Sequence, residues 1–96
     1  MVKKSFIIKP PVSQKLFRDT ISGFKEYIFN LNLDAELKSS YLNLLKSADL
    51  IKINKPEHED VEVLMKILLL STKTKFEKDM KRIFKHTREI ILKNKK

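Results

Sequence analysis

The 96-residue sequence contains no cysteine, no tryptophan, a single glycine and three prolines. Without cysteine the chain can form no disulfide, no thiolate zinc site and no cysteine nucleophile. A turn-rich β-sandwich or barrel, or a glycine-rich phosphate-binding loop, needs more glycine and proline than this sequence holds. These absences favour a small helical protein.

Long apolar runs are also missing. The longest one, residues 63–70, is interrupted by Lys66, and a membrane span needs about 20 apolar residues. Near the N-terminus only Phe6, Ile7 and Ile8 are consecutive apolar residues, which is too few for a secretory signal. We therefore expect a cytoplasmic protein with no membrane span.

Hydrophobic residues make up 42% of the chain and recur at the three- and four-residue spacing of amphipathic helices. Helices are predicted over residues 13–30 and 35–48, from Pro56 to about residue 70, and from about Thr74 onward. Ser13 and Asp34 suit N-caps, Pro56 suits a first helical turn, and Thr74 with Glu77 has capping-box spacing. The fold class predicted is all-α: a small antiparallel bundle of about four helices in a single domain, residues 13–96, preceded by an extended N-terminal arm, residues 1–12.

Each predicted helix has one face that should be buried. Gly23 interrupts the first of these faces, either as a tolerated weak point or as the site of a close helix crossing. The third helix is apolar over so much of its surface that a homodimer, which would bury the part left uncovered by the other helices, is one interpretation. The faces consist of Phe17, Ile21, Phe24, Ile28 and Leu31; Leu37, Tyr41, Leu44, Leu45 and Ala48; Val61, Leu64, Met65 and Leu68; and Phe76, Met80, Ile83, Thr87 and Ile90.

The net charge of +9 is concentrated at the C-terminus. Residues 1–9 carry +3, residues 10–72 carry −1 and residues 73–96 carry +7. On a helical wheel the cations of the last segment lie opposite its apolar face, with two acid–base pairs of favourable spacing, Glu77 with Lys81 and Glu89 with Lys93. The predicted binding residues are Lys78, Lys81, Arg82, Lys85 and Arg88, extended by Lys93, Lys95 and Lys96.

A row of cations along one helix face fits an anionic partner, most simply the phosphate backbone of a nucleic acid or an acidic protein surface. Lysine, which predominates here, lacks the planar fork that reads guanine, so contacts to the backbone are favoured over base readout. Phe84 and Tyr27 are the only rings expected to be available for stacking on single strands. The leading interpretation is a non-enzymatic accessory protein that binds nucleic acid or a nucleic-acid-handling complex.

The alternative interpretation is a protein–protein regulator: an inhibitor, an antitoxin-like partner or an immunity-type protein. In size, basicity and four-helix layout the chain resembles small cytoplasmic bacteriocin-immunity proteins. Under this interpretation the apolar residues Phe6, Ile7 and Ile8 of the arm, together with a groove in the bundle, would contact the partner.

No constellation typical of catalysis is visible. His58 lies among acidic residues and could ligate a metal with Glu62, but acids at a helix start are explained by the helix dipole. His86 is expected to be an isolated, solvated side chain. We expect no enzyme activity, no metal site and no cofactor.

Overall fold

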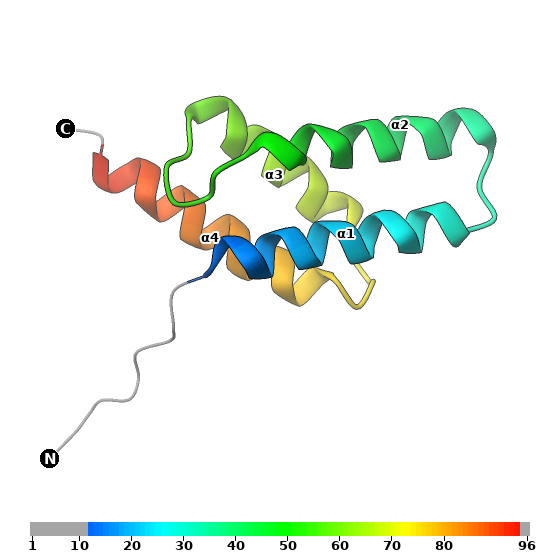
Figure 1. Ribbon diagram of the computed structural model, residues 1–96, viewed down its shortest axis with the longest axis horizontal. Coiled ribbons are helices and arrows are strands. Elements are labelled where there is room, and N and C mark those ends of the chain that lie inside the picture. Colours follow the sequence, from blue (N-terminus) through cyan, green and yellow to red (C-terminus); the bar gives the residue numbers. More distant parts are fainter. Residues whose placement is uncertain (1–11, 95–96) are drawn as a thin grey trace, which may run out of the picture.

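Two antiparallel helical hairpins pack across each other in the computed structural model, which describes residues 12–94 (Figure 1). The first hairpin consists of α1 (Gln14–Asn30) and α2 (Ala35–Ser47), followed by the 3₁₀ turn η2 (Ala48–Leu50). The second consists of α3 (His58–Leu70) and α4 (Glu77–Asn94). The predicted all-α bundle is therefore confirmed. The predicted arm residues Phe6, Ile7 and Ile8 lie outside the described residues, as do Lys95 and Lys96.

The helix starts follow the capping signals of the sequence at α1 and α2 but not at α3 and α4. The side chain of Ser13 accepts a hydrogen bond from the N–H of Leu16 at 3.0 Å, and Asp34 caps α2 in the same way. Pro56 was placed wrongly in the first turn of α3, because Glu57 is the cap: its N–H donates to the carboxylate of Asp60 at 2.9 Å. Thr74 was expected to form a capping box with Glu77, but α4 begins only at Glu77, whose carboxylate accepts from the N–H of Lys73 instead.

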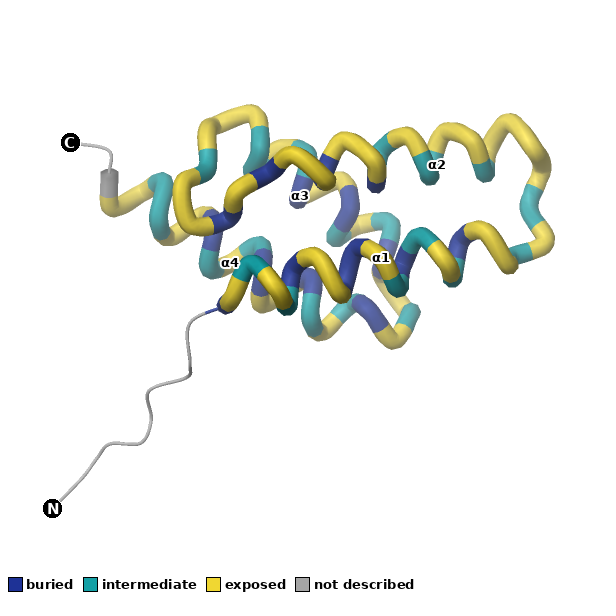
Figure 2. Tube along the Cα trace, in the orientation of Figure 1, coloured by how far each residue is buried: buried dark blue, intermediate teal, exposed yellow. Residues whose placement is uncertain are grey.

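The core lies where the two hairpins cross (Figure 2). Its centre is an aromatic cluster in which the ring of Phe76 stacks on Phe24 at 5.0 Å and meets Tyr27 edge-on at 5.6 Å. Gly23 makes this approach possible, since a Cβ there would lie 3.2 Å from the Phe76 ring. The buried apolar residues around the cluster include Val12, Phe17, Ile21, Ile28, Leu45, Ala48, Ile51, Ile53, Leu64, Ile67, Met80 and Ile83.

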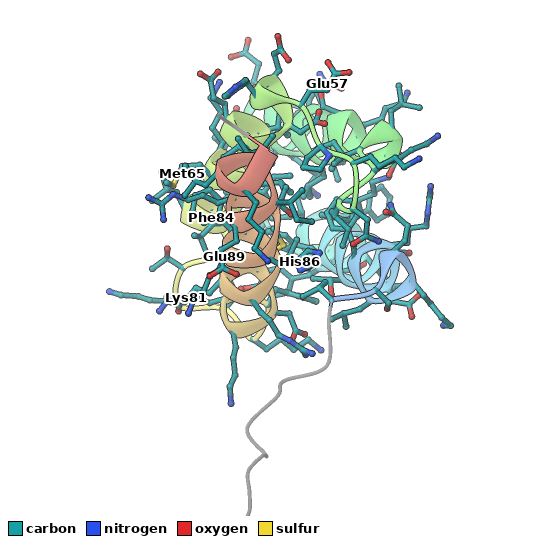
Figure 3. All side chains as sticks on the ribbon, turned by 90° about the vertical axis from the view of Figure 1, so that its left-hand side faces the viewer. Glu57, Met65, Lys81, Phe84, His86 and Glu89 are labelled. Atoms are coloured by element: carbon teal, nitrogen blue, oxygen red, sulfur yellow. The ribbon has the colours of Figure 1, made fainter. Side chains whose placement is uncertain are left out.

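Two residues assigned to the core are exposed instead. Leu37, with 40% of its surface exposed, belongs to the start of α2, at the end of the first hairpin that reaches past α3 and α4 (Figure 1). Met65, also 40% exposed, lies on the side of α3 turned away from α1 and α2 (Figure 3). In both cases the helix is correct, but no second layer covers that position.

A side-chain amide fastens the segment after η2 to α1. Gln14 donates from Nε2 to the carbonyl of Ile51 at 2.9 Å and accepts at Oε1 from the N–H of Ile53 at 3.1 Å. Both isoleucines are buried, and only the N–H of Ile51 bonds back into η2, to the carbonyl of Ala48. Gln14 therefore supplies the partners of the Ile51 carbonyl and the Ile53 N–H, two backbone groups next to buried side chains. Within residues 12–94 no helix is long and apolar enough to cross a membrane.

Replacing Phe76 by alanine should remove the aromatic contact between the two hairpins. We expect Phe76→Ala to lower the free energy of unfolding by about 3–5 kcal/mol, because a buried ring leaves a cavity. Phe29, which is 65% exposed on α1, provides the matched control, and Phe29→Ala should cost under about 1 kcal/mol. Urea unfolding followed by circular dichroism measures both. Equal losses for the two variants would contradict the central role of Phe76.

Replacing Gln14 tests the amide clamp. Gln14→Ala leaves the carbonyl of Ile51 and the N–H of Ile53 without their partner, which should cost about 1–3 kcal/mol of unfolding free energy. Asn43→Ala removes another side-chain amide, from an exposed position of α2, and should change stability by less than about 0.5 kcal/mol. Urea unfolding distinguishes the two, and a Gln14→Ala variant as stable as the control would show that the clamp contributes nothing.

Candidate functional site

The cations of the C-terminal helix form a single exposed face. The buried side of α4 is set by Met80, Ile83 and Thr87, and the hydroxyl of Thr87 donates back to the carbonyl of Ile83 at 2.8 Å. This packing fixes the rotation of the helix about its axis, so residues on the opposite side point into solvent. We call that side the cationic face; its described members are Lys78, Lys81, Arg82, Lys85, Arg88 and Lys93, all of them exposed.

Acidic neighbours neutralise only part of this face. Lys81 forms an ion pair with Glu77 at 3.4 Å, one of the two pairs that the spacing favours. In the second pair, Glu89 and Lys93 lie too far apart to form an ion pair in the described part of the chain. Figure 3 shows Glu89 toward the viewer on α4, between the levels of Phe84 and Lys81. Lys78, Lys85 and Arg88 likewise form no ion pair with any residue of 12–94.

The turn before α4 is held by Glu77 as well. Its carboxylate accepts a hydrogen bond from the N–H of Lys73 at 3.1 Å, and Lys73 adopts a left-handed φ of 69°. The N–H of Lys73, followed by the ammonium of Lys81, lowers the pKa of Glu77 below its ordinary value of 4.5. Glu77 thus ends the turn, begins α4 and balances one cation of the face.

Beside the cationic face lies an apolar strip that the sequence analysis assigned partly to the core. Met65 and Leu69 on α3 and Leu92 on α4 are exposed by 40%, 65% and 52%, and Phe84 between them is half-buried. Figure 3 shows Met65, Phe84 and Lys81 at the same side of the α3–α4 pair. The sequence signal for this strip is the excess of apolar residues on the third helix, which does not show which of them are exposed.

A shallow cleft of about 260 Å³ continues this strip toward the end of the hairpin. Val61 and Ile91 provide apolar lining, and Arg88 places a cation beside them. His58 and Glu62, considered above as metal ligands, also line this cleft. Among residues 12–94 no three His, Asp or Glu side chains are arranged to hold a metal ion. The cleft therefore offers apolar lining to a side chain of a partner, with Arg88 and Glu62 as its charged neighbours.

The other predicted residues lie elsewhere. His86 was predicted to be isolated and solvated, but it is half-buried, and its Nε2 lies 2.9 Å from Oδ1 of Asn54, in the loop before α3. Figure 3 shows His86 on the side of α4 toward α1, away from Met65. Tyr27 is engaged with Phe24 and Phe76 in the core cluster. Neither residue belongs to the cationic face.

The lowered pKa of Glu77 predicts a specific acid dependence of stability. A carboxylate with a lowered folded-state pKa stabilises the fold above its unfolded value of 4.5, and this contribution disappears as the pH falls through the folded value. We expect the melting temperature of Glu77→Gln to lie below that of the parent at pH 7 and to approach it as the pH falls below 4.5. Glu89→Gln removes the same charge from the same helix, so an identical pH profile for the two variants would contradict the role of the Lys73 N–H.

Comparison of the chain with protein families, with curated proteins and with solved structures finds no match.

Proposed function

We propose that this protein is a non-enzymatic binding protein whose cationic face docks on the phosphate backbone of a nucleic acid. The observation that carries the proposal is the set of exposed cations Lys78, Lys85 and Arg88, which have no acidic partner within residues 12–94. Cations without acidic partners can neutralise phosphates and displace the counterions that are condensed on the nucleic acid. The release of these counterions favours binding at low salt.

The dimensions of the face suit this partner. From Lys78 to Lys93 the helix rises about 22 Å at 1.5 Å per residue. One strand of B-DNA presents about six phosphates over that length, at 3.4 Å of axis each. Lysine predominates, so contacts to the backbone with little sequence preference are expected.

We propose binding rather than catalysis because, within residues 12–94, neither histidine lies in a cleft with a second group positioned for proton transfer. His86 is hydrogen-bonded to Asn54, and His58 is exposed among the carboxylates at the start of α3. General acid–base chemistry needs two poised groups converging on one cleft. The cleft beside Arg88 offers one carboxylate, Glu62, and one imidazole at an open surface.

One observation favours a second candidate, a regulator that binds another protein. Leu69 and Leu92 expose more than half of their surface next to the cations. A phosphate backbone makes no favourable contact with such apolar side chains, whereas a protein surface can bury them. Phe6, Ile7 and Ile8 of the predicted arm would add to such a contact.

Charge reversal tests the leading proposal. Lys78→Glu/Lys85→Glu should weaken binding to labelled duplex DNA at least about tenfold and reduce the slope of log K against log salt by about two contacts. Fluorescence anisotropy at two salt concentrations, with duplex DNA, single-stranded DNA and RNA, measures both quantities.

The matched control changes the net charge equally at another surface. Lys46→Glu/Lys52→Glu alters exposed lysines at the end of α2 and after η2. It should reduce affinity only slightly, through the general field of the protein. The same loss in both double variants would mean that overall charge, and no particular face, attracts the nucleic acid; an absence of binding at low salt would overturn the proposal itself.

A further inference from the structure

We infer that the outer face of the α3–α4 hairpin is a docking groove for an acidic amphipathic helix of a partner protein. The groove is defined by Met65 and Leu69 on α3, by Phe84 and Leu92 on α4, and by the cleft between Val61 and Ile91. The inference goes beyond the nucleic-acid proposal, because it depends on these apolar residues, which a phosphate backbone would leave unused.

The spacing of these side chains suits a third helix. Met65 and Leu69 are four residues apart on α3, and Phe84 and Leu92 are eight apart on α4, so each pair lies along one side of its helix. Two antiparallel helices with apolar residues along their shared outer edge form the groove in which amphipathic helices dock through i, i+4 and i+7 anchors. Figure 3 shows Met65 and Phe84 on this edge, facing away from the first hairpin.

The apolar surface is unusual for the outside of a helical layer. Leu69 and Leu92 are 65% and 52% exposed, although polar side chains occupy most of the other outward positions of α3 and α4. Burying one leucine against a partner raises the affinity by roughly tenfold to a hundredfold. A contiguous apolar strip rimmed by charge is typical of a protein-binding surface.

The charges around the strip identify the chemistry of the occupant. Lys66 is the exposed residue after Met65 on α3, and Lys85 is the exposed residue after Phe84 on α4. Arg88 lines the cleft itself, whereas the charge of Lys81 is balanced by Glu77. Glu62 is the carboxylate that lines the cleft. A helix with leucines on one side and carboxylates along its flanks would therefore match both the strip and its rim.

A second copy of this chain fits the rim less well. In a symmetric dimer the same patch faces itself, so a rim with more cations than carboxylates would meet a rim with the same excess of positive charge. Like charges brought together in this way weaken association. The charge balance of the rim therefore favours a partner of opposite sign over self-association.

A designed peptide provides the test. The probe is a fluorescein-labelled amphipathic peptide of about 18 residues, five helical turns, with leucines at i, i+3, i+4 and i+7 and glutamates elsewhere. A reordered peptide of the same composition, with the leucines spread around the helix, is the control for plain charge attraction. We expect the intact protein to bind the amphipathic peptide with a Kd of roughly 10–100 µM and the reordered peptide at least about fivefold more weakly.

Variants of the protein locate the contact. Leu69→Ser should raise the Kd for the amphipathic peptide about tenfold, because one well-buried leucine is lost from the contact. Leu50→Ser is the matched control: Leu50 is 89% exposed on η2, and its replacement should leave the Kd unchanged. Both residues are exposed, so circular dichroism should show the same fold for both variants, and both should bind duplex DNA as the parent does.

Four results would overturn the inference. No binding of the amphipathic peptide at about 1 mM, near the weak end of specific affinities, would remove the groove as a docking site. Equal binding of the two peptides would reduce it to charge attraction. A parallel loss of DNA binding in Leu69→Ser would assign the strip to the nucleic acid. A concentration-dependent dimer in sedimentation experiments, abolished by Leu69→Ser, would assign it to a second copy.

Discussion

The ring of Phe76 determines how the two helical hairpins meet. It packs over Gly23, stacks on Phe24 and touches Tyr27 edge-on. A Cβ at position 23 would lie only 3.2 Å from the ring and would push it away from α1. Phe76 also immediately precedes α4. Its position therefore fixes where α4 begins against α1, and the turn held by Glu77 and Lys73 fixes how the chain arrives there.

The orientation of α4 follows from this anchor. With Phe76, Met80 and Ile83 buried toward the first hairpin, helical periodicity turns Lys78 and Lys85 to the outside. The same two-layer arrangement leaves the outer side of α3 without a covering helix. Most exposed positions of α3 and α4 carry polar or charged side chains, as a solvated surface requires. Met65 and Leu69 on α3 and Leu92 on α4 are the exceptions, and they distinguish the candidate docking surface from an ordinary solvated face.

Much of this fold could be predicted because its signals are local. Ser13 and Asp34 cap the helices that they were expected to cap, and the buried stripes of α1 and α4 repeat at helical spacing. The apolar residues of α3 surround the whole helix, so periodicity could not separate the buried Leu64 from the exposed Met65. Leu37 was misplaced because helical spacing says nothing of where a neighbouring layer ends.

Long-range polar contacts could not be predicted for a related reason. Gln14 bonds to residues 37 and 39 positions away, and His86 to one 32 positions away. No local pattern marks such partners, because each depends on the hairpins already being packed. The cationic face could be predicted since all of its members share one helix, whereas the groove beside it combines two helices and emerges only in the folded chain.

Binding through charge and binding through apolar area respond differently to salt. This difference separates the cationic face of α4 from the apolar strip beside it. An exposed ion pair contributes about 0–1 kcal/mol and weakens as salt screens it. Nucleic acid gains affinity by summing many such cations, so its binding must fall steeply with ionic strength. Burial of Leu69 and Leu92 contributes more per residue and hardly depends on moderate salt. Affinity that persists when ionic strength is raised therefore reports the apolar strip, and affinity that vanishes reports the cationic face.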